Sequence, residues 1–182
     1  MATRKNDRRV RRTKRIIRDA LIKLMLDKPV AGVTITELCK EADINRNTFY
    51  AHYSAPEDVF AEIENELLAD LSSMLEEENV TVSICRAIDE DRNRWRAIWY
   101  GSPRLLERAW DTCCENVLAQ WDAQNLLDVE EGKLFLLFIT RGASGLIGNW
   151  LDEGCRMPPE EIGAIVERFV FQGLQGISDR LL

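Results

Sequence analysis

Two short amphipathic segments joined by a three-residue turn occupy residues 33–53 of this 182-residue chain. Thr34 and Glu37 form the pattern of a capping box, in which the Thr hydroxyl accepts a backbone N–H and the Glu carboxylate reaches back. Asp43 lies where the chain must reverse, and Asp tolerates the left-handed conformation better than most residues. Asn45 is a favourable N-cap for a second helix. The segment therefore predicts a helix-turn-helix.

The second predicted helix has two chemically different faces. Phe49 and Tyr53 are four residues apart and can pack inward together. The opposite face carries Arg46, Asn47 and Tyr50. Arg and Asn make bidentate hydrogen bonds to the edges of guanine and adenine in the major groove. This outer face therefore predicts contact with DNA bases.

The other polar side chains of the segment are suited to contacts with the DNA backbone, which set register rather than sequence preference. The full predicted DNA-binding set is Thr34, Thr36, Asn45, Arg46, Asn47, Thr48, Tyr50 and His52. The alternative is a pair of capped surface helices in an ordinary bundle, because capping boxes alone are common. The spacing, the inward aromatic pair and the polar outer face together favour DNA binding, since helix-turn-helix geometry constrains both helices.

Charge is divided unevenly along the chain. Residues 1–53 hold 13 Lys and Arg against 6 Asp and Glu, a net charge of +7, whereas residues 54–182 hold 11 against 25, a net charge of −14. This asymmetry predicts a basic DNA-binding domain over 1–53, including an N-terminal arm, and an acidic effector-binding and dimerisation domain over 54–182. Neutralisation of phosphates by the basic domain should make DNA affinity depend steeply on salt.

The N-terminal arm is strongly basic and contains a single acid, Asp7. Its basic residues are Arg4, Lys5, Arg8, Arg9, Arg11, Arg12, Lys14 and Arg15. A solvated tail is one interpretation, because charge runs usually are solvated. An arm that contacts phosphates or enters the minor groove is the other, and the neighbouring helix-turn-helix favours it. No apolar run follows that would make a secretory signal.

Several functional classes are disfavoured by composition. No apolar stretch approaches the length that crosses a bilayer, which predicts a soluble, cytoplasmic protein without membrane association. The five cysteines lack zinc-type CxxC spacing and His52 is the only histidine, so we expect no metal and no other cofactor. The same shortage of histidine leaves no nucleophile–base pair, which argues against an enzyme.

Helical periodicity continues through the rest of the chain and predicts an all-α fold. Ser54 and Glu57 form a second capping box, which opens a longer helix toward the body. The other expected helices cover about residues 9–27, 80–90, 92–100, 103–124, 130–153 and 160–182.

The predicted helix over 130–153 is apolar around most of its circumference, which requires burial on more than one side. Glycines within a helix cost about 1 kcal/mol each relative to Ala and are better explained where another helix approaches closely. A core within one chain is the alternative, but the two-fold symmetry of most helix-turn-helix sites favours a homodimer. The predicted dimer interface contains Phe138, Gly142, Gly145, Gly148, Phe169 and Leu174.

Aromatic residues concentrate in the middle of the chain. Ordinary core packing is the first interpretation, and the second is an effector pocket, because ligand sites favour aromatic walls with a few polar groups. The candidate pocket residues are Trp95, Trp99, Tyr100, Trp110 and Cys113.

The segment from about Arg12 to Ile63 resembles the TetR family of one-component bacterial regulators. The similarity lies in Thr34-Ile-Thr-Glu-Leu, Ala42, the run 45–53 and Glu57-Asp-Val-Phe. The resemblance implies a three-helix DNA-binding head, a fourth helix that links it to the body, and a helical body that dimerises and often binds an effector. It also implies phosphate contacts by Thr34, Thr48, Tyr50 and His52, and base contacts by Arg46 and Asn47.

Three positions depart from the family pattern. Asp43 replaces the usual turn Gly, Asn47 replaces a small residue, and Pro56 replaces a Lys that contacts phosphate. These departures leave the operator sequence open. The body resembles, more weakly, the branch of dihydroxyacetone-kinase activator-like regulators, in which the effector can be another protein.

These observations predict a transcriptional regulator, specifically a repressor, that binds a near-palindromic site in double-stranded DNA as a homodimer. Its recognition helices would enter successive major grooves roughly 34–36 Å apart. An unidentified small-molecule or protein effector in the body would weaken DNA binding through the helix that begins near Ser54. The alternative is a regulatory adaptor or co-activator whose body recognises a partner protein rather than a small molecule.

Overall fold

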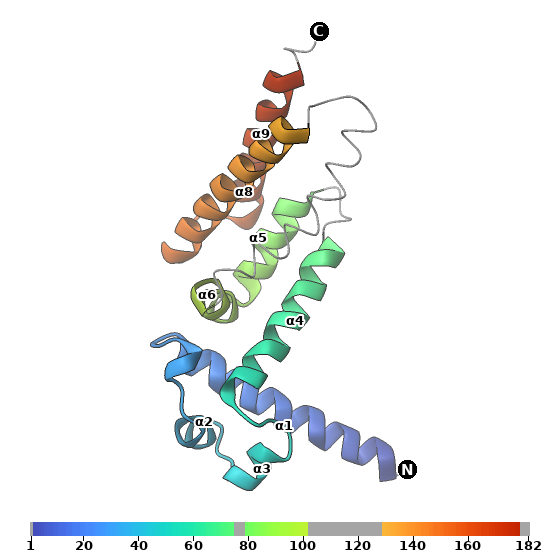
Figure 1. The fold of residues 1–182 in the computed structure, drawn as a ribbon, viewed down its shortest axis with the longest axis vertical. Coiled ribbons are helices and arrows are strands. Elements are labelled where there is room, and N and C mark those ends of the chain that lie inside the picture. Colours follow the sequence, from blue (N-terminus) through green and yellow to red (C-terminus); the bar gives the residue numbers. More distant parts are fainter. Residues whose placement is uncertain (1, 75–78, 102–128, 179–182) are drawn as a thin grey trace. The chain divides into compact units, whose positions relative to one another are not determined.

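The computed structural model describes residues 2–74, 79–101 and 129–178 (Figure 1). Every regular element in these ranges is helical, which confirms the predicted all-α fold. The predicted helix over 103–124 lies outside the described residues. The elements are α1 (Ala2–Met25), the 3-10 turn η1 (Val30–Gly32), α2 (Ile35–Glu41), α3 (Arg46–Tyr50), α4 (Pro56–Met74), α5 (Val80–Glu90), α6 (Arg92–Gly101), α8 (Val129–Asp152) and α9 (Pro159–Ser178).

The chain divides into two compact units. The N-terminal unit comprises Met1–Leu67 together with Asn93–Ser102, and the C-terminal unit comprises Leu68–Arg92 together with Pro103–Leu182. Helix α4 runs from the first unit into the second. The functional boundary predicted between residues 53 and 54 remains a prediction, because compactness alone does not assign function.

The core of the N-terminal unit joins α1 to the helix-turn-helix. Ile17 and Leu21 of α1, Leu38 of α2, Phe49 of α3 and Val59 of α4 are fully buried. Burial of large apolar side chains contributes about 1.5–3 kcal/mol each relative to exposure. The short helices α2 and α3 therefore owe their stability to this shared core, since isolated helices of five to seven residues do not persist in water.

Helix α1 begins earlier than predicted, at Ala2 instead of about Arg9. The first turns contain Arg and Lys, which are good helix formers, and no Pro or Gly interrupts them. The sequence expectation was wrong because it equated a run of charge with the absence of regular structure. The basic arm is the N-terminal part of a 24-residue helix.

The start of α4 differs from the predicted capping box by one residue. Pro56 is the first helical residue, where its missing N–H costs little. The third helical residue is therefore Asp58, and its carboxylate accepts from the N–H groups of Ser54 at 2.8 Å and Ala55 at 3.0 Å. Asp58 thus performs the role that the spacing assigned to Glu57.

The C-terminal unit is built around α9, which packs against α5 and α8. Gly163 of α9 permits a close approach to α5, because a Cβ at this position would lie 2.7 Å from the Cα of Val82. The turn between α8 and α9 is closed by Trp150, whose indole N–H donates to the carbonyl of Met157 at 2.9 Å. Gly154 in this turn has a φ of +80°, which favours glycine.

Helix α8 corrects one sequence expectation. Over Glu130–Asp152 it is long and apolar enough to cross a membrane by length and composition, although no such stretch was expected. Core helices of soluble proteins satisfy the same criterion, and Phe135, Leu136, Ile139, Ile147 and Trp150 of α8 are buried within the protein. The helix is therefore weak support for a membrane span.

Candidate nucleic-acid interface

The predicted capping box at the start of α2 is confirmed. The hydroxyl oxygen of Thr34 accepts from the Glu37 N–H at 3.2 Å, and the Glu37 carboxylate accepts from the Thr34 N–H at 2.9 Å. These reciprocal bonds satisfy two N–H groups that a helix start otherwise leaves unpaired. They fix the direction in which α2 leaves the preceding loop.

The turn between α2 and α3 has the predicted left-handed residue. Asp43 has a φ of +51°, and the Ile44 N–H then donates to the carbonyl of Cys39 at 3.0 Å. Asn45 caps α3 by accepting from the Thr48 N–H at 2.8 Å. The chain reversal thus depends on one residue that tolerates the left-handed region and on the cap that follows it.

The inner face of α3 is aromatic, as predicted. Phe49 is fully buried, and the exposed fraction of Tyr53 is 7%. Their ring centroids lie 6.0 Å apart, within the range of favourable aromatic pairs. This pair attaches the second helix of the motif to the core.

The outer face of α3 presents Arg46, Asn47 and Tyr50 to solvent, as predicted from their spacing. Tyr50 is 56% exposed although its ring also touches the edge of Phe49. Arg46 donates from its guanidinium to the hydroxyl of Thr36 at 2.6 Å. These side chains are the part of the motif that is available to base edges.

Two of the predicted phosphate contacts use their hydroxyl hydrogens locally. The Thr34 hydroxyl donates to the Glu37 carboxylate at 2.7 Å, and the Thr48 hydroxyl donates to Asn45 Oδ1 at 3.0 Å. A hydroxyl has a single hydrogen, and a phosphate oxygen only accepts. Contact with phosphate through either hydroxyl would therefore replace an existing bond, while His52 is half-buried.

Sequence reasoning missed Lys28, which binds the capping carboxylate. Its ammonium donates to Glu37 Oε1 at 2.7 Å. This hydrogen bond, together with those from Thr34, lowers the pKa of Glu37 to about 2. Lys28 lies nine residues before Glu37 in a loop, so no helical spacing could have paired the two side chains.

The basic arm contributes a second positive surface on α1. Arg8, Arg9, Arg11, Arg12 and Arg15 are exposed. A shallow groove of about 480 Å³ is lined by Arg11, Arg12, Arg15, Ile16 and Asp19. Exposed guanidinium groups of this density suit contact with phosphates.

The capped α2–α3 pair, with its polar outer face and a basic helix in the same unit, defines the N-terminal unit as a helix-turn-helix DNA-binding domain. Residues 17–63 match the family model of bacterial regulatory proteins of the tetR family. Residues 17–63 therefore have the helix-turn-helix domain typical of tetR-type bacterial regulatory proteins.

Known proteins extend this similarity beyond the motif. An uncharacterized HTH-type transcriptional regulator, YxbF of Bacillus subtilis, is 26% identical over 174 residues, covering 85% of this chain and 43% of the relative. The chain thus spans less than half the length of that curated relative.

Solved structures show the shared fold. A TetR transcriptional regulator from Streptococcus agalactiae has a TM-score of 0.67 at 20% identity, covering 92% of this chain and 98% of that one. The dihydroxyacetone kinase operon activator DhaS has a TM-score of 0.61 at 14% identity, covering 90% and 96%.

The candidate effector residues do not line one described cavity. Trp95 of α6 is buried, and Trp99 is half-buried. Tyr100 is 55% exposed and lines a groove of about 270 Å³ with residues at the end of α1. Trp110 and Cys113 lie outside the described residues.

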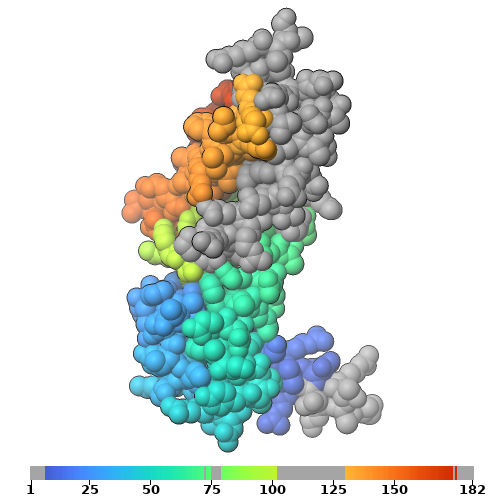
Figure 2. All heavy atoms as spheres, viewed as in Figure 1, coloured from blue at the N-terminus to red at the C-terminus, as the bar shows by residue number. Residues whose placement is uncertain are grey.

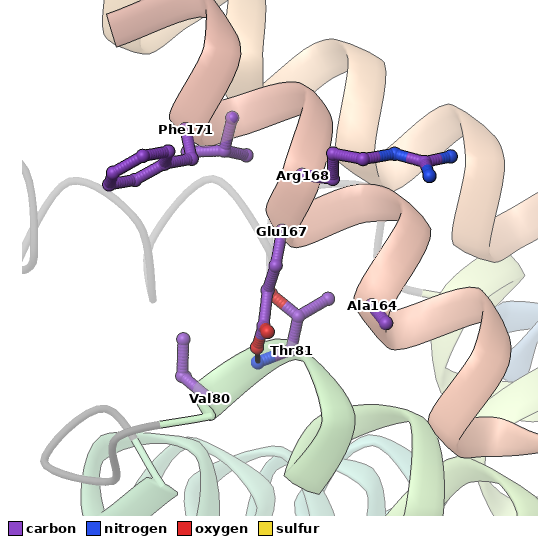
Figure 3. Close-up of a pocket in the computed structure, with 7 residues that line it drawn as sticks. Val80, Thr81, Ala164, Glu167, Arg168 and Phe171 are labelled. Carbon is purple, nitrogen blue, oxygen red and sulfur yellow. Dashed lines mark hydrogen bonds between the residues drawn. The ribbon is translucent and has the colours of Figure 1, made fainter. Parts of the chain in front are cut away.

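A larger cavity occurs in the C-terminal unit, between the start of α5 and α9 (Figure 3). It has a volume of about 530 Å³, within the range of ligand sites. Glu167 points toward α5 and accepts from the Thr81 N–H at 3.2 Å, whereas Arg168 points away. The other lining residues are Val80, Ala164, Val170 and Phe171.

The candidate dimer residues occupy different environments. Phe138 and Phe169 are 73% and 50% exposed, and a Cβ added at Gly142 or Gly145 would meet nothing within 4 Å. Gly148 is instead buried within its own chain. Leu174 belongs to α9, and its side chain lies outside the described part. The space-filling view shows α8, coloured orange, as a continuous stretch of surface (Figure 2).

Proposed function

We propose that the protein is a homodimeric repressor that binds a near-palindromic operator through α3 and releases it when an effector binds the body. The observation that carries this proposal is the outer face of α3, where Arg46, Asn47 and Tyr50 are exposed above a buried aromatic pair. A rigidly mounted Arg and Asn can discriminate bases at about 1–3 kcal/mol per bidentate contact.

Dimerisation is supported by an apolar stripe on α8. Leu134, Leu137, Phe138 and Leu146 are 68%, 53%, 73% and 39% exposed, and Gly142 lies between them. The intervals of three, four and eight residues put these side chains on one helical face. A second copy would bury this stripe and supply the two-fold symmetry of a palindromic site.

Effector control is proposed to act along α4. This helix starts three residues after Tyr53 and its last residues belong to the C-terminal unit, so it is the element through which we expect a change in the body to reach the DNA-binding residues. The cavity beside Glu167 has a volume of about 530 Å³, which is within the range of small-molecule sites. A partner protein remains the second candidate effector, because the sequence of the body resembles regulators in which the effector can be another protein.

A selection experiment tests the proposal. The purified protein would be mixed with genomic fragments, and bound fragments would be sequenced. We expect a short near-palindromic site to be enriched, and transcription from a reporter carrying that site to fall when the protein is expressed. Recovery of fragments without a shared sequence would contradict sequence-specific binding, and a rise in transcription would indicate an activator.

A second measurement addresses the effector. A metabolite screen by thermal shift would be compared with a pull-down from native lysate, using the full chain in both. A metabolite that raises the melting temperature and releases the selected DNA supports a small-molecule effector. A retained protein that alters DNA affinity supports the adaptor alternative. We also expect a cytoplasmic location and no turnover.

A further inference from the structure

A cluster of four charged side chains joins α1 to α4 within the N-terminal unit. Lys14 and Arg18 are one turn apart on α1, and Glu62 and Glu66 are one turn apart on α4. The Lys14 ammonium donates to Glu62 Oε2 at 2.6 Å, while the Arg18 guanidinium lies 3.6 Å from Glu62 Oε1 and also binds Glu66. These ion pairs on two successive helical turns therefore fix how α1 and α4 align along their lengths.

The cluster is shielded more than a typical surface ion pair. The side chains of Lys14, Arg18 and Glu62 are 33%, 22% and 28% exposed. An exposed pair contributes little, because water and salt screen it. Partial burial with two cations around one carboxylate makes the geometry of Glu62 more consequential, since removal of one partner leaves the others without compensation.

Lys14 also contacts Tyr53, which follows α3. Its ammonium lies 5.0 Å from the centroid of the Tyr53 ring, within cation–π range. Tyr53 in turn packs on Phe49, the buried residue of α3. A continuous series of contacts therefore runs from Glu62 through Lys14 and Tyr53 to the inner face of the recognition helix.

The same contacts remove one cation of the basic arm, Lys14, from the charge available to DNA. Lys14 belongs to the basic arm by sequence, but its ammonium is bound to Glu62 and its side chain is 33% exposed, whereas the side chain of Arg12 is exposed. A cation held by a carboxylate gains less from a phosphate than a free one does. Glu62 thus lowers attraction to DNA of any sequence.

We propose that Glu62 is a positioning residue for DNA specificity: it fixes α1 and the Phe49–Tyr53 pair relative to α4, and it withholds Lys14 from non-specific phosphate contacts. The inference rests on the proposed binding of a specific DNA site. Loss of Glu62 should strengthen binding to DNA of any sequence and weaken the preference for the specific site. The two effects have opposite signs, so specificity can be distinguished from total positive charge.

The test compares Glu62→Gln with Glu64→Gln. Both substitutions remove one negative charge from α4, but Glu64 makes none of the contacts that Glu62 makes with Lys14 and Arg18. Affinity would be measured for two probes, the duplex that the wild-type protein enriches from a random pool and a scrambled duplex of the same composition. Melting curves would establish that each variant is folded at the assay temperature.

For Glu62→Gln we expect the ratio of selected to scrambled affinity to fall about tenfold, a size typical of coupled contacts. Affinity for the scrambled duplex should rise, and the salt slope should steepen by about one, the value for one additional phosphate contact. Glu64→Gln should leave the ratio at the wild-type level. Equal ratios in the two variants would overturn the inference.

Two further variants guard against simple loss of folding. Tyr53→Phe retains the ring beneath Lys14 and should keep the ratio, whereas Tyr53→Leu should lower it. Lys14→Arg keeps a cation beside Glu62 and over the Tyr53 ring and should keep the ratio, whereas Lys14→Met should lower it, and a Lys14→Met variant with the wild-type ratio would refute the role. If the wild-type protein enriches no duplex, the proposed function itself fails, which is a separate outcome.

Discussion

Arg46 donates from its guanidinium to the hydroxyl of Thr36 at 2.6 Å, so the first residue of α3 is tied to α2 across the turn of the motif. Both side chains are exposed, and both belong to the set predicted to contact DNA. The bond restricts the rotamers of Arg46 before DNA arrives. Holding an interacting group in place reduces the entropy that binding must overcome.

Substitution Arg46→Ala should weaken binding to the selected duplex by about 1–3 kcal/mol and relax preference at one base pair. Thr36→Val should cause a smaller loss of about 0.5–1 kcal/mol, because it removes one neutral hydrogen-bond partner while Arg46 remains. Fluorescence anisotropy with selected and scrambled duplexes would measure both effects. Equal loss on the two duplexes would refute base reading by Arg46.

The left-handed turn residue provides a stability prediction. Asp43→Gly should stabilise the protein by about 0.5 kcal/mol. Glycine removes the conformational energy that Asp43 has at φ +51°, and this gain should slightly exceed the entropy that glycine adds to the unfolded chain. Asp43→Val should destabilise it by about 1–2 kcal/mol, because a branched Cβ clashes in this region. Urea denaturation would measure both. A Val variant as stable as the wild type would show that the turn can rearrange.

The pair of Lys28 and Glu37 predicts a dependence of stability on pH. The pKa of Glu37 is lowered to about 2 in the folded protein, so the unfolded chain binds the proton more tightly. The stabilisation is therefore complete above the ordinary Glu pKa and is lost as the pH falls toward 2. Glu37→Gln, which retains a capping side chain, should be less stable than wild type at neutral pH. The denaturation midpoints of wild type and Glu37→Gln should approach each other as the pH falls toward 2. Midpoints that stay apart in acid would contradict a stabilising role for the Glu37 carboxylate.

The exposed stripe of α8 predicts how the oligomer can be broken. Phe138→Glu would place a charge within the proposed interface and should produce a monomer that binds the selected duplex weakly. Phe171→Glu is the matched control, because Phe171 is 61% exposed but lines the cavity beside α5. Sedimentation velocity at micromolar concentration would separate the two. If Phe138→Glu remains a dimer, the dimer interface lies on a different face from the α8 stripe.

Close packing of α5 on α9 predicts a large effect from one methyl group. In Gly163→Ala the new Cβ would lie 2.7 Å from the Cα of Val82, and a backbone atom cannot swing aside. We expect a loss of about 1–3 kcal/mol, as for other overpacked sites. Gly142→Ala is the comparison, because a Cβ there meets nothing in the same chain. An unchanged denaturation midpoint for Gly163→Ala would mean that the helices separate at little cost.

Local rules accounted for much of the DNA-binding motif. Capping by Thr34 and Asn45 and reversal at Asp43 each depend on residues within five positions of one another, and the four-residue spacing of Phe49 and Tyr53 indicated that both face inward. Such interactions have fixed sequence separations, so their spacing alone reveals them. The same reasoning placed the cap of α4 one residue too early. Glu57 and Asp58 are adjacent acids, and the spacing did not show which of them caps the helix.

The sequence by itself determined the helical class, the helix-turn-helix and the outward Arg and Asn, because these follow from periodicity and short-range hydrogen bonding. Only the tertiary structure showed that Lys14 of the basic arm is bound to Glu62, 48 residues away, and that Lys28 holds the Glu37 carboxylate. It also separated Gly142, which faces open space, from the buried Gly148. Long-range ion pairs and helix approaches depend on how the elements pack, and no periodicity within one helix specifies a partner on another.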